Sequence, residues 1–316
     1  MTPIADADFD ALYDAAYAAF DAGRLEDASE LFRRLLEHEP DTAHLHYMRG
    51  LAHKYLRDWP TSLQHNLLAL EHADELDEAA AWNAGIAATA LGDWARARQL
   101  WRDCGLGIPD GDGPIDGDFG PVSIRLNPWS GGETVWARRI DVVRARLLNV
   151  PLPESGYRFG DIVLHDGAAL GRRRVDEREY PVFNALQRLQ RSEFQTFVAF
   201  VSCGSAADLD ALVQAQAPGL GCIEDWTGSI VHYCLRCSYG APHRHDDEAR
   251  KDWAAERNLG IAAQSLRTVE KLLHAWQRGG HGRQVDEVRA TDRPIPEPEP
   301  GQVWWLGPDE SDGEAD

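Results

Sequence analysis

The stretch that decides the first part of the fold is ALYDAAYAAFDAGRLEDASELFRRLLEHEP (residues 11–40). Two similar stretches follow it, AHLHYMRGLAHKYLRDWPTSLQHNLLALEH (43–72) and AAAWNAGIAATALGDWARARQLWRDCG (79–105). A unit of this length that repeats along a chain is typical of a solenoid built from pairs of helices. The sequence therefore predicts three helical hairpins one after another.

Equivalent positions recur in the three stretches. The central turns fall at 23–25, 57–59 and 92–94, which are steps of 34 and 35 residues. A small residue where the two helices cross recurs as Ala16, Gly50 and Gly85. The second helix begins around Ala28, Ser62 and Ala97, and a larger residue one turn later is Phe32, Asn66 or Trp101. Pro40 ends the first unit, as expected of a helix stop.

With these positions, residues 10–106 resemble the tetratricopeptide repeat (TPR) family. The resemblance implies a right-handed stack with an inner groove that holds a protein partner. Groove positions of the family fall on Tyr13, Tyr17, Tyr47, Leu51, Tyr55, Trp82 and Ile86, with Asp10, Asp21, His44 and Lys54 among them. The carboxylate-clamp members of the family have Lys and Asn where this chain has Tyr13 and Tyr17, so we do not expect that clamp. The alternative is that a C-terminal element of the same chain fills the groove.

The rest of the chain predicts a different kind of structure, so the predicted fold class is α+β. An all-α TPR solenoid precedes a mixed α/β domain that has a small antiparallel sheet and a zinc knuckle. The expected parts are repeats (1–106), a Gly/Asp/Pro linker (107–120), a small β-sheet or barrel (121–182), an α+β unit with a Cys/His motif and a C-terminal helix (183–290), and an acidic disordered tail (291–316).

Local signals give more detail within these parts. Asp166-Gly167 is a hairpin turn signal, and Ser205 with Asp208 predicts the beginning of a helix. Further strands are expected at 194–203, 221–228 and 229–234, and a helix or a broken pair of helices at 247–278. The apolar segment Val303–Leu306 interrupts the acidic tail, so we expect it to dock on its own chain, for example in the groove.

The one motif with metal chemistry is YCLRCSYGAPHRHDD (233–247). Cys-x2-Cys is a zinc-knuckle spacing, and two nearby histidines would complete a tetrahedral shell. The predicted ligands of a structural Zn²⁺ are Cys234, Cys237, His243 and His245, with Cys222 as a further candidate. The alternatives are that no metal binds, that the Cys pair is redox-active, or that the zinc is catalytic.

Other candidate sites have weaker support. The histidines of the repeats (His38, His44, His46, His53, His65 and His72) lack the i, i+4 spacing of a helical zinc site, so we expect surface or capping residues. Ser202, Cys203 and Ser205 lack the G-x-S-x-G elbow of a hydrolase nucleophile. Neither a G-x-G-x-x-G nor a G-K-[ST] sequence occurs, which argues against nucleotide use.

The charge and the composition narrow the function classes. The formal net charge is −20, and residues 1–106 hold 19 acidic against 9 basic residues. An acidic surface disfavours nucleic-acid binding and attracts basic partners. The sequence has no apolar run of membrane length and does not begin like a secretion signal, so we expect a cytoplasmic protein. Its 29 Arg against 3 Lys are typical of a GC-rich, bacterial coding genome.

These observations favour a non-catalytic binding protein whose partner is another protein. An immunity or antitoxin protein that neutralises a basic toxin fits this description, and so does an adaptor or chaperone for a secreted effector. The alternative class is an enzyme whose site lies within 121–250, with candidates His232, Cys234, Cys237, His243 and His245. The sequence leaves the oligomeric state open.

The zinc hypothesis gives a first prediction. Elemental analysis of the purified protein should find one zinc per chain, and Cys234→Ser or His243→Ala should lose the metal and the local fold, since a structural site contributes to folding. A wild-type protein without metal would contradict the hypothesis.

Overall fold

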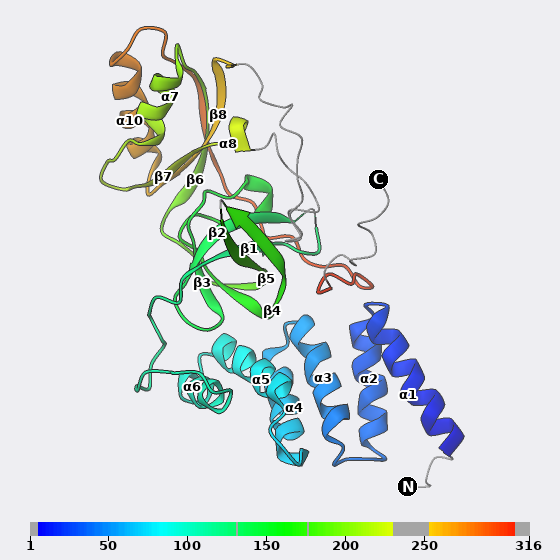
Figure 1. Cartoon of the computed structure of the whole chain (residues 1–316). Helices are drawn as coiled ribbons and strands as arrows, with labels where there is room; N and C mark the ends of the chain where they lie inside the picture. Colours follow the sequence, from blue (N-terminus) through cyan, green and yellow to red (C-terminus); the bar gives the residue numbers. More distant parts are fainter. Residues whose placement is uncertain (1–5, 131, 176, 230–252, 307–316) are drawn as a thin grey trace.

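The computed structural model describes residues 6–130, 132–175, 177–229 and 253–306. Six helices come first, a closed five-stranded barrel follows, and a four-stranded sheet with its own helices comes last (Figure 1). The barrel lies between the other two parts (Figure 1). The predicted α+β class is therefore confirmed. The first six helices are α1 (Asp6–Asp21), α2 (Leu25–Leu36), α3 (Ala43–Tyr55), α4 (Trp59–His72), α5 (Glu78–Leu91) and α6 (Trp94–Asp103).

The three helical hairpins turn in the same way. Gly23, Arg57 and Gly92 adopt the left-handed conformation, with φ of 71°, 60° and 72°. In each turn, the backbone N–H of the residue after the left-handed one donates to the carbonyl five residues earlier. The three bonds are Arg24 to Ala19, Asp58 to His53 and Asp93 to Ala88, each at 2.9 Å. This bond defines the Schellman motif that ends a helix. The predicted turns are confirmed in position.

The aligned small residues are required by close packing inside the hairpins. A Cβ at Gly50 would lie 2.5 Å from the side-chain nitrogen (Nδ2) of Asn66, and a Cβ at Gly85 would lie 2.4 Å from the Trp101 ring. Both partners are the larger residues that the alignment placed one turn into the second helix. A larger residue at either glycine would push the two helices of its hairpin apart.

Two histidines of the repeats are buried, so the prediction of surface or capping residues is wrong for them. His46 and His65 are each 6% exposed. Their ring nitrogens form one chain of hydrogen bonds: His46 Nε2 lies 2.8 Å from the Pro40 carbonyl, the two Nδ1 atoms lie 2.9 Å apart, and Arg49 Nη1 lies 3.0 Å from His65 Nε2. The carbonyl only accepts and the guanidinium only donates, so every ring nitrogen is used when both rings are neutral.

The barrel is a meander that closes on itself. Its strands are β1 (Pro121–Leu126), β2 (Glu133–Arg139), β3 (Arg144–Leu147), β4 (Ile162–Val175) and β5 (Arg178–Gln190). Successive strands are antiparallel, whereas β1 and β5 pair in parallel. The parallel pair follows from the odd number of strands, because the first and fifth strands of a meander point the same way. Strand β5 continues through residue 182, so the barrel ends at Gln190, later than the predicted boundary.

Asp166-Gly167 is not a hairpin turn, and that prediction is wrong. Strand β4 continues through it and the chain reverses between Val175 and Arg178. The register between β4 and β5 shifts on both sides of His165, which is the signature of a bulge. The bulge faces the helices, where Asp166 and Gly167 find partners.

The last part has the strand order of a ferredoxin-like fold. Its elements are β6 (Gln195–Ser202), α7 (Ala206–Val213), β7 (Leu220–Asp225), α8 (Trp226–Ser229), β8 (Glu256–Ala263), α10 (Leu266–Arg278) and β9 (Gln284–Thr291). The sheet order is β7-β8-β6-β9, which is two interleaved β-α-β units. Helices α7 and α10 share the core of one sheet face, and the Trp276 indole donates to the Asp208 carbonyl at 2.8 Å. Ser205 caps α7 as predicted.

The predicted helix at 247–278 is correct only in its second half, because residues 256–263 form a central strand between β6 and β7. Every second residue of this strand is buried under the helices: Leu259, Ile261 and Ala263. The run LGIAA is too short and too uniformly apolar for this two-residue period to be recognised in the sequence. Strand β9 was not predicted. Residues 230–234, part of another expected strand, lie outside the described residues.

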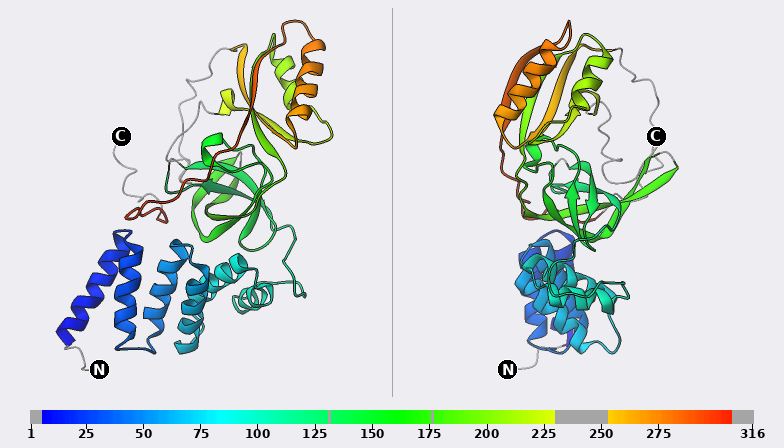
Figure 2. Two further views of the ribbon diagram at one scale, coloured as in Figure 1. Left: turned by 180° about the vertical axis from the view of Figure 1, so that it is seen from behind. Right: turned by 90° about the vertical axis from the view of Figure 1, so that its left-hand side faces the viewer.

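The tail is ordered as far as Leu306, so the prediction of disorder from residue 291 is wrong for this stretch. It leaves β9 and returns along the barrel to the helices (Figure 2). The Trp129 indole donates to the Pro296 carbonyl at 2.8 Å, and the Gly301 N–H donates to the Gly23 carbonyl at 3.2 Å. Trp304 and Trp305 are 4% and 8% exposed. The expectation that this apolar segment docks on its own chain is confirmed.

One hydrophobic core joins the helices, the barrel and the tail. It contains helix residues such as Phe20 and Ile86, the barrel residues Leu164 and Leu186, and Trp304 of the tail. The linker is irregular but fixed, because Arg98 Nε donates to the Gly113 carbonyl at 2.8 Å.

The histidine chain predicts that the protein loses stability in mild acid. Burial, followed by the charge of Arg49, lowers the pKa of His65 to about 3, and burial also lowers the pKa of His46. A folded-state pKa below the unfolded value near 6.5 gives stability that is present above pH 6.5 and is lost as the pH falls. His65 alone should make the free energy of unfolding about 2 kcal/mol smaller at pH 5 than at pH 7.

Urea unfolding at the two pH values measures this effect. His65→Gln should reduce the pH dependence, whereas His274→Gln, at an exposed position of α10, should leave it as in the wild type. An unchanged pH dependence in His65→Gln would contradict the assignment.

Candidate functional site

The predicted groove residues divide into two sets. Tyr13 and Tyr17 lie on α1, three others on α3 and two on α5. The half-buried set is Tyr13, Tyr17, Tyr47, Leu51 and Trp82, and the buried set is Tyr55 and Ile86. Residues of the first set can offer surface to a partner.

Four aromatic rings form a continuous row across α1 and α3, which we call the aromatic ladder: Tyr13, Tyr17, His44 and Tyr47. The ring centroids of Tyr13 and Tyr17 are 4.7 Å apart, those of Tyr17 and His44 are 6.0 Å apart, and those of His44 and Tyr47 are 6.2 Å apart. The Tyr17 hydroxyl is hydrogen bonded to His44 Nε2. Rings held in this way lose little conformational freedom when a partner binds.

The ladder lies in an acidic surrounding. Asp10, Asp14 and Asp21 are exposed on α1 at the three- and four-residue spacing that puts them beside Tyr13 and Tyr17. Burial, together with Tyr13 and the charge of Asp21, raises the pKa of the Tyr17 phenol, so the hydroxyl stays protonated at neutral pH. Burial likewise raises the pKa of Tyr47. The surface therefore combines aromatic rings with negative charge.

The barrel covers the neighbouring part of the predicted groove. Lys54 donates to Asp166 at 2.7 Å and to Asn83 at 3.0 Å, and the side chains of both ions are less than 10% exposed. A Cβ at position 167 would lie 1.7 Å from the Trp82 indole nitrogen, so only glycine fits there. The bulge in β4 thus makes two contacts with the repeats. Asp166 pairs with Lys54, and the backbone of Gly167 packs against the Trp82 ring.

The tail covers Tyr55. The Trp305 ring stacks on Tyr55 with centroids 4.6 Å apart and an interplanar angle of 9°, and it also contacts Phe20 at 5.5 Å. Arg57, the non-glycine turn residue, lies over the Trp129 ring and pairs with Glu297 of the tail. The alternative that a C-terminal element fills the groove therefore holds at Tyr55, where Trp305 stacks, whereas at Trp82 the contacting segment is the bulge of the barrel.

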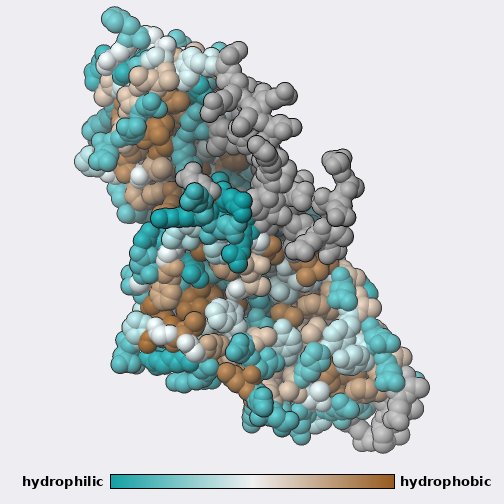
Figure 3. Space-filling model, in the orientation of Figure 1, coloured by the Kyte–Doolittle hydropathy of each residue, from teal (hydrophilic) through white to brown (hydrophobic). Residues whose placement is uncertain are grey.

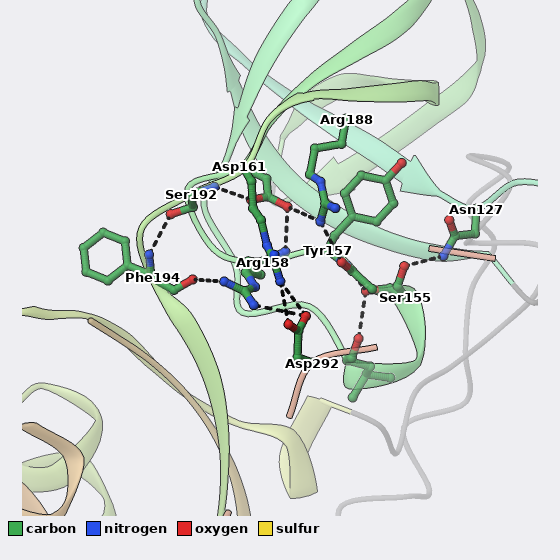
Figure 4. Close-up of polar contacts among 12 residues, drawn as sticks. Asn127, Ser155, Tyr157, Arg158, Asp161, Arg188, Ser192, Phe194 and Asp292 are labelled. Carbon is green, nitrogen blue, oxygen red and sulfur yellow. Dashed lines mark hydrogen bonds and ion pairs between the residues drawn. The ribbon is translucent and has the colours of Figure 1, made fainter. Parts of the chain in front are cut away.

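A second polar cluster lies where the barrel meets the sheet (Figure 4). The fully buried Asp161 accepts from the Ser192 N–H at 2.7 Å and from the Arg158 N–H at 3.0 Å, with Arg188 at 3.5 Å. Asp292 at the beginning of the tail accepts from Arg158 at 3.0 Å and also from Arg191. The charged groups pair with one another, so we interpret the cluster as a joint between the parts.

The described cysteines do not have the features of nucleophiles. Burial raises the pKa of Cys203, of Cys104 and, to about 11, of Cys222. A protonated thiol is a poor nucleophile and a poor metal ligand. Ser205 is engaged as the cap of α7.

The predicted zinc ligands Cys234, Cys237, His243 and His245, and the candidate His232, lie outside the described residues, so the zinc site stays a prediction. Within the described part of the chain, no group of three His, Cys, Asp or Glu side chains could hold a metal. None of the helices described there combines the length and apolar character that a membrane span requires.

No protein-family model and no curated protein matches the chain. Among solved structures, the CopN–Scc3 complex aligns with 32% of this chain at 17% identity and a TM-score of 0.31, over 59% of that protein's length. The second TPR domain of Spaghetti (RPAP3), bound to an HSP90 peptide, aligns with 30% of this chain and 88% of its own length, at 22% identity and a TM-score of 0.29. The TPR2B domain of yeast Sti1, complexed with Hsp70, aligns with 31% of this chain and 82% of its own length, at 15% identity and a TM-score of 0.27. These values are too low to assign a function.

The buried ion pair between the helices and the barrel predicts a large effect on stability. Lys54→Met should lower the free energy of unfolding by about 3–5 kcal/mol, because it leaves Asp166 buried without its cation. Arg24→Ala, which removes the exposed pair with Asp27, should cost less than about 1 kcal/mol. Urea unfolding of both variants measures the difference, and equal costs would show that the buried pair does not hold the two parts together.

Proposed function

We propose that this chain is a non-catalytic protein that binds another protein through the aromatic ladder and the acidic face of α1. The observation that supports this most directly is that the tail buries Tyr55 and the bulge of the barrel packs against the Trp82 indole, whereas His44 of the ladder is exposed and its three tyrosines are half-buried. Tyrosine combines apolar contact area with a hydrogen-bonding tip, which suits it to interfaces.

The charge of the face defines the class of partner segment. Asp10, Asp14 and Asp21 favour Lys and Arg in the partner. The lysine that could attract an acidic segment, Lys54, is buried and already paired with Asp166. We therefore expect an extended segment that carries basic and apolar side chains.

Within this class we propose a protein of the immunity or antitoxin type, which sequesters a basic toxin. The support is general: the net charge of −20 favours capture of a basic partner. An adaptor for a secreted effector has the same charge requirement. A toxin gene directly upstream would favour the immunity function, and co-expression should then rescue growth from that toxin.

Peptide selection tests the binding surface directly. A random-peptide display library selected on the wild type should yield, among its binders, a class of sequences rich in basic and apolar residues, and this class is then tested on the variants. Binding of the selected peptides should weaken at least about tenfold in Tyr13→Ala/Tyr17→Ala, a loss typical of interface anchors. It should also weaken when salt is raised.

Phe200→Ala, on strand β6 of the four-stranded sheet, is the control because it removes a half-buried aromatic side chain outside the ladder. If the selected peptides bind the ladder variant as well as the wild type, the ladder is not the binding surface. If they lack basic residues, the charge argument is wrong.

A further inference from the structure

The outer surface of the barrel carries a second apolar site, which lies outside the core shared with the helices. It is a pocket of about 230 Å³ lined by Pro121, Trp136, Ala137, Leu148, Val175 and Tyr180. Leu148 and Val175 are 40% and 42% exposed. Large aliphatic side chains that gather in one exposed pocket mark an interaction site more often than single ones do.

Arginines surround this pocket. The register of β2 and β3 sets Arg138 directly opposite Arg146. Since residues two apart in a strand share a face, these two lie on the side of Trp136 and Leu148. The β4–β5 hairpin projects from the barrel (Figure 2). At its end, Arg178 pairs with Val175 and lies on the same strand face as Tyr180. We call the pocket and these three arginines the arginine-rimmed cup.

The positive charge of the rim is only partly neutralised. Arg138 pairs with Asp118, whereas Arg146 and Arg178 are exposed and make no ion pair with any described residue. Two arginines directly opposite each other on one face repel, and a bound anion would relieve the repulsion. In a chain of net charge −20 this locally basic surface is an exception.

The aromatic floor of the cup is fixed before any ligand binds. The rings of Trp136 and Tyr180 meet edge to face with centroids 5.1 Å apart, and the Arg173 guanidinium lies 4.6 Å over the Trp136 ring. The Trp136 backbone N–H donates to the side chain of Asn149. Trp, Tyr and Arg are the residues that dominate binding energy at protein interfaces.

We propose that the arginine-rimmed cup binds a short acidic segment of a partner protein, with one apolar side chain inserted between Trp136, Leu148 and Tyr180. The volume is below the roughly 300–1,000 Å³ of small-molecule sites and suits a single side chain. The rim arginines then pair with carboxylates on either side of the anchor. This site is separate from the ladder. It favours an acidic partner segment, whereas the ladder favours a basic one.

Single-stranded nucleic acid fits the same surface less well. Bases stack on open aromatic faces, but one face of Trp136 is covered by Arg173 and the two rings are edge to face. The net charge of −20 also repels a polyanion at long range.

The test uses the full-length chain and a fluorescein-labelled peptide, GDEDFEDEG, in an anisotropy titration. Replacing the phenylalanine by alanine, or the acids by glutamine, should each weaken binding at least about fivefold. Leu148→Ser should weaken binding at least about fivefold, and Arg146→Glu/Arg178→Glu at least about tenfold. These residues are exposed, so the variants should keep the thermal midpoint of the wild type.

Tyr13→Ala/Tyr17→Ala is the control that should leave this binding unchanged, so a failure of the cup and a failure of the ladder give different results. The proposal is overturned if the peptide does not bind, if the glutamine peptide binds equally well, or if oligo-dT binds more tightly and is displaced by the same arginine changes. It is also overturned if ultracentrifugation shows a dimer that Arg146→Glu dissociates, because the occupant would then be a second copy.

Discussion

The arrangement of this molecule depends on how the apolar surface left by the stack of helical hairpins is covered. A repeat buries its apolar face only against a neighbour, so the last repeat and the turn ends leave apolar surface that something must cover. Here the barrel and the returning tail cover it, and Leu164, Leu186 and Trp304 enter the same core as the helices. The ion pair of Lys54 and Asp166 lies inside this contact and fixes the position of the barrel on the helices, because a shift would leave two charges buried and unpaired.

This contact also decides which surface remains for a partner. It uses the second half of α3 and the middle of α5, where Tyr55 and Trp82 lie against the tail and the bulge. The aromatic ladder lies on the middle turns of α1 and the first half of α3, where its rings stay half-buried or exposed. On the face shown in Figure 3, hydrophobic areas lie over the barrel and over the helices, with hydrophilic areas around them. On this face the hydrophobic surface is divided between the parts.

The sequence predicted the features that local chemistry controls. Turn glycines, small residues opposite large ones and the Ser205 cap have short-range causes, and each is where the pattern indicated. The errors arose where the cause is distant in sequence. Asp166-Gly167 looks like a turn, but its role is set by Lys54 and Trp82, more than 80 residues earlier. The tail looks disordered because it is acidic and rich in proline, and its order comes from Tyr55, Trp129 and Gly23. His46 and His65 have no helical spacing in common, and they meet only because α3 and α4 pair.

The charge distribution gives the two surfaces a physical relation to each other. An acidic ladder face and a basic cup on one chain favour segments of opposite charge, so a single partner segment cannot satisfy both. The barrel carries the cup and also contacts the helices through the shared core, which makes the distance between the two surfaces a property of the fold. A partner with a basic segment and an acidic segment at the matching distance would gain from both contacts at once, because the second contact forms at high effective concentration. The spacing between two contacts of moderate affinity would then select the partner. Neither surface alone could give this selectivity.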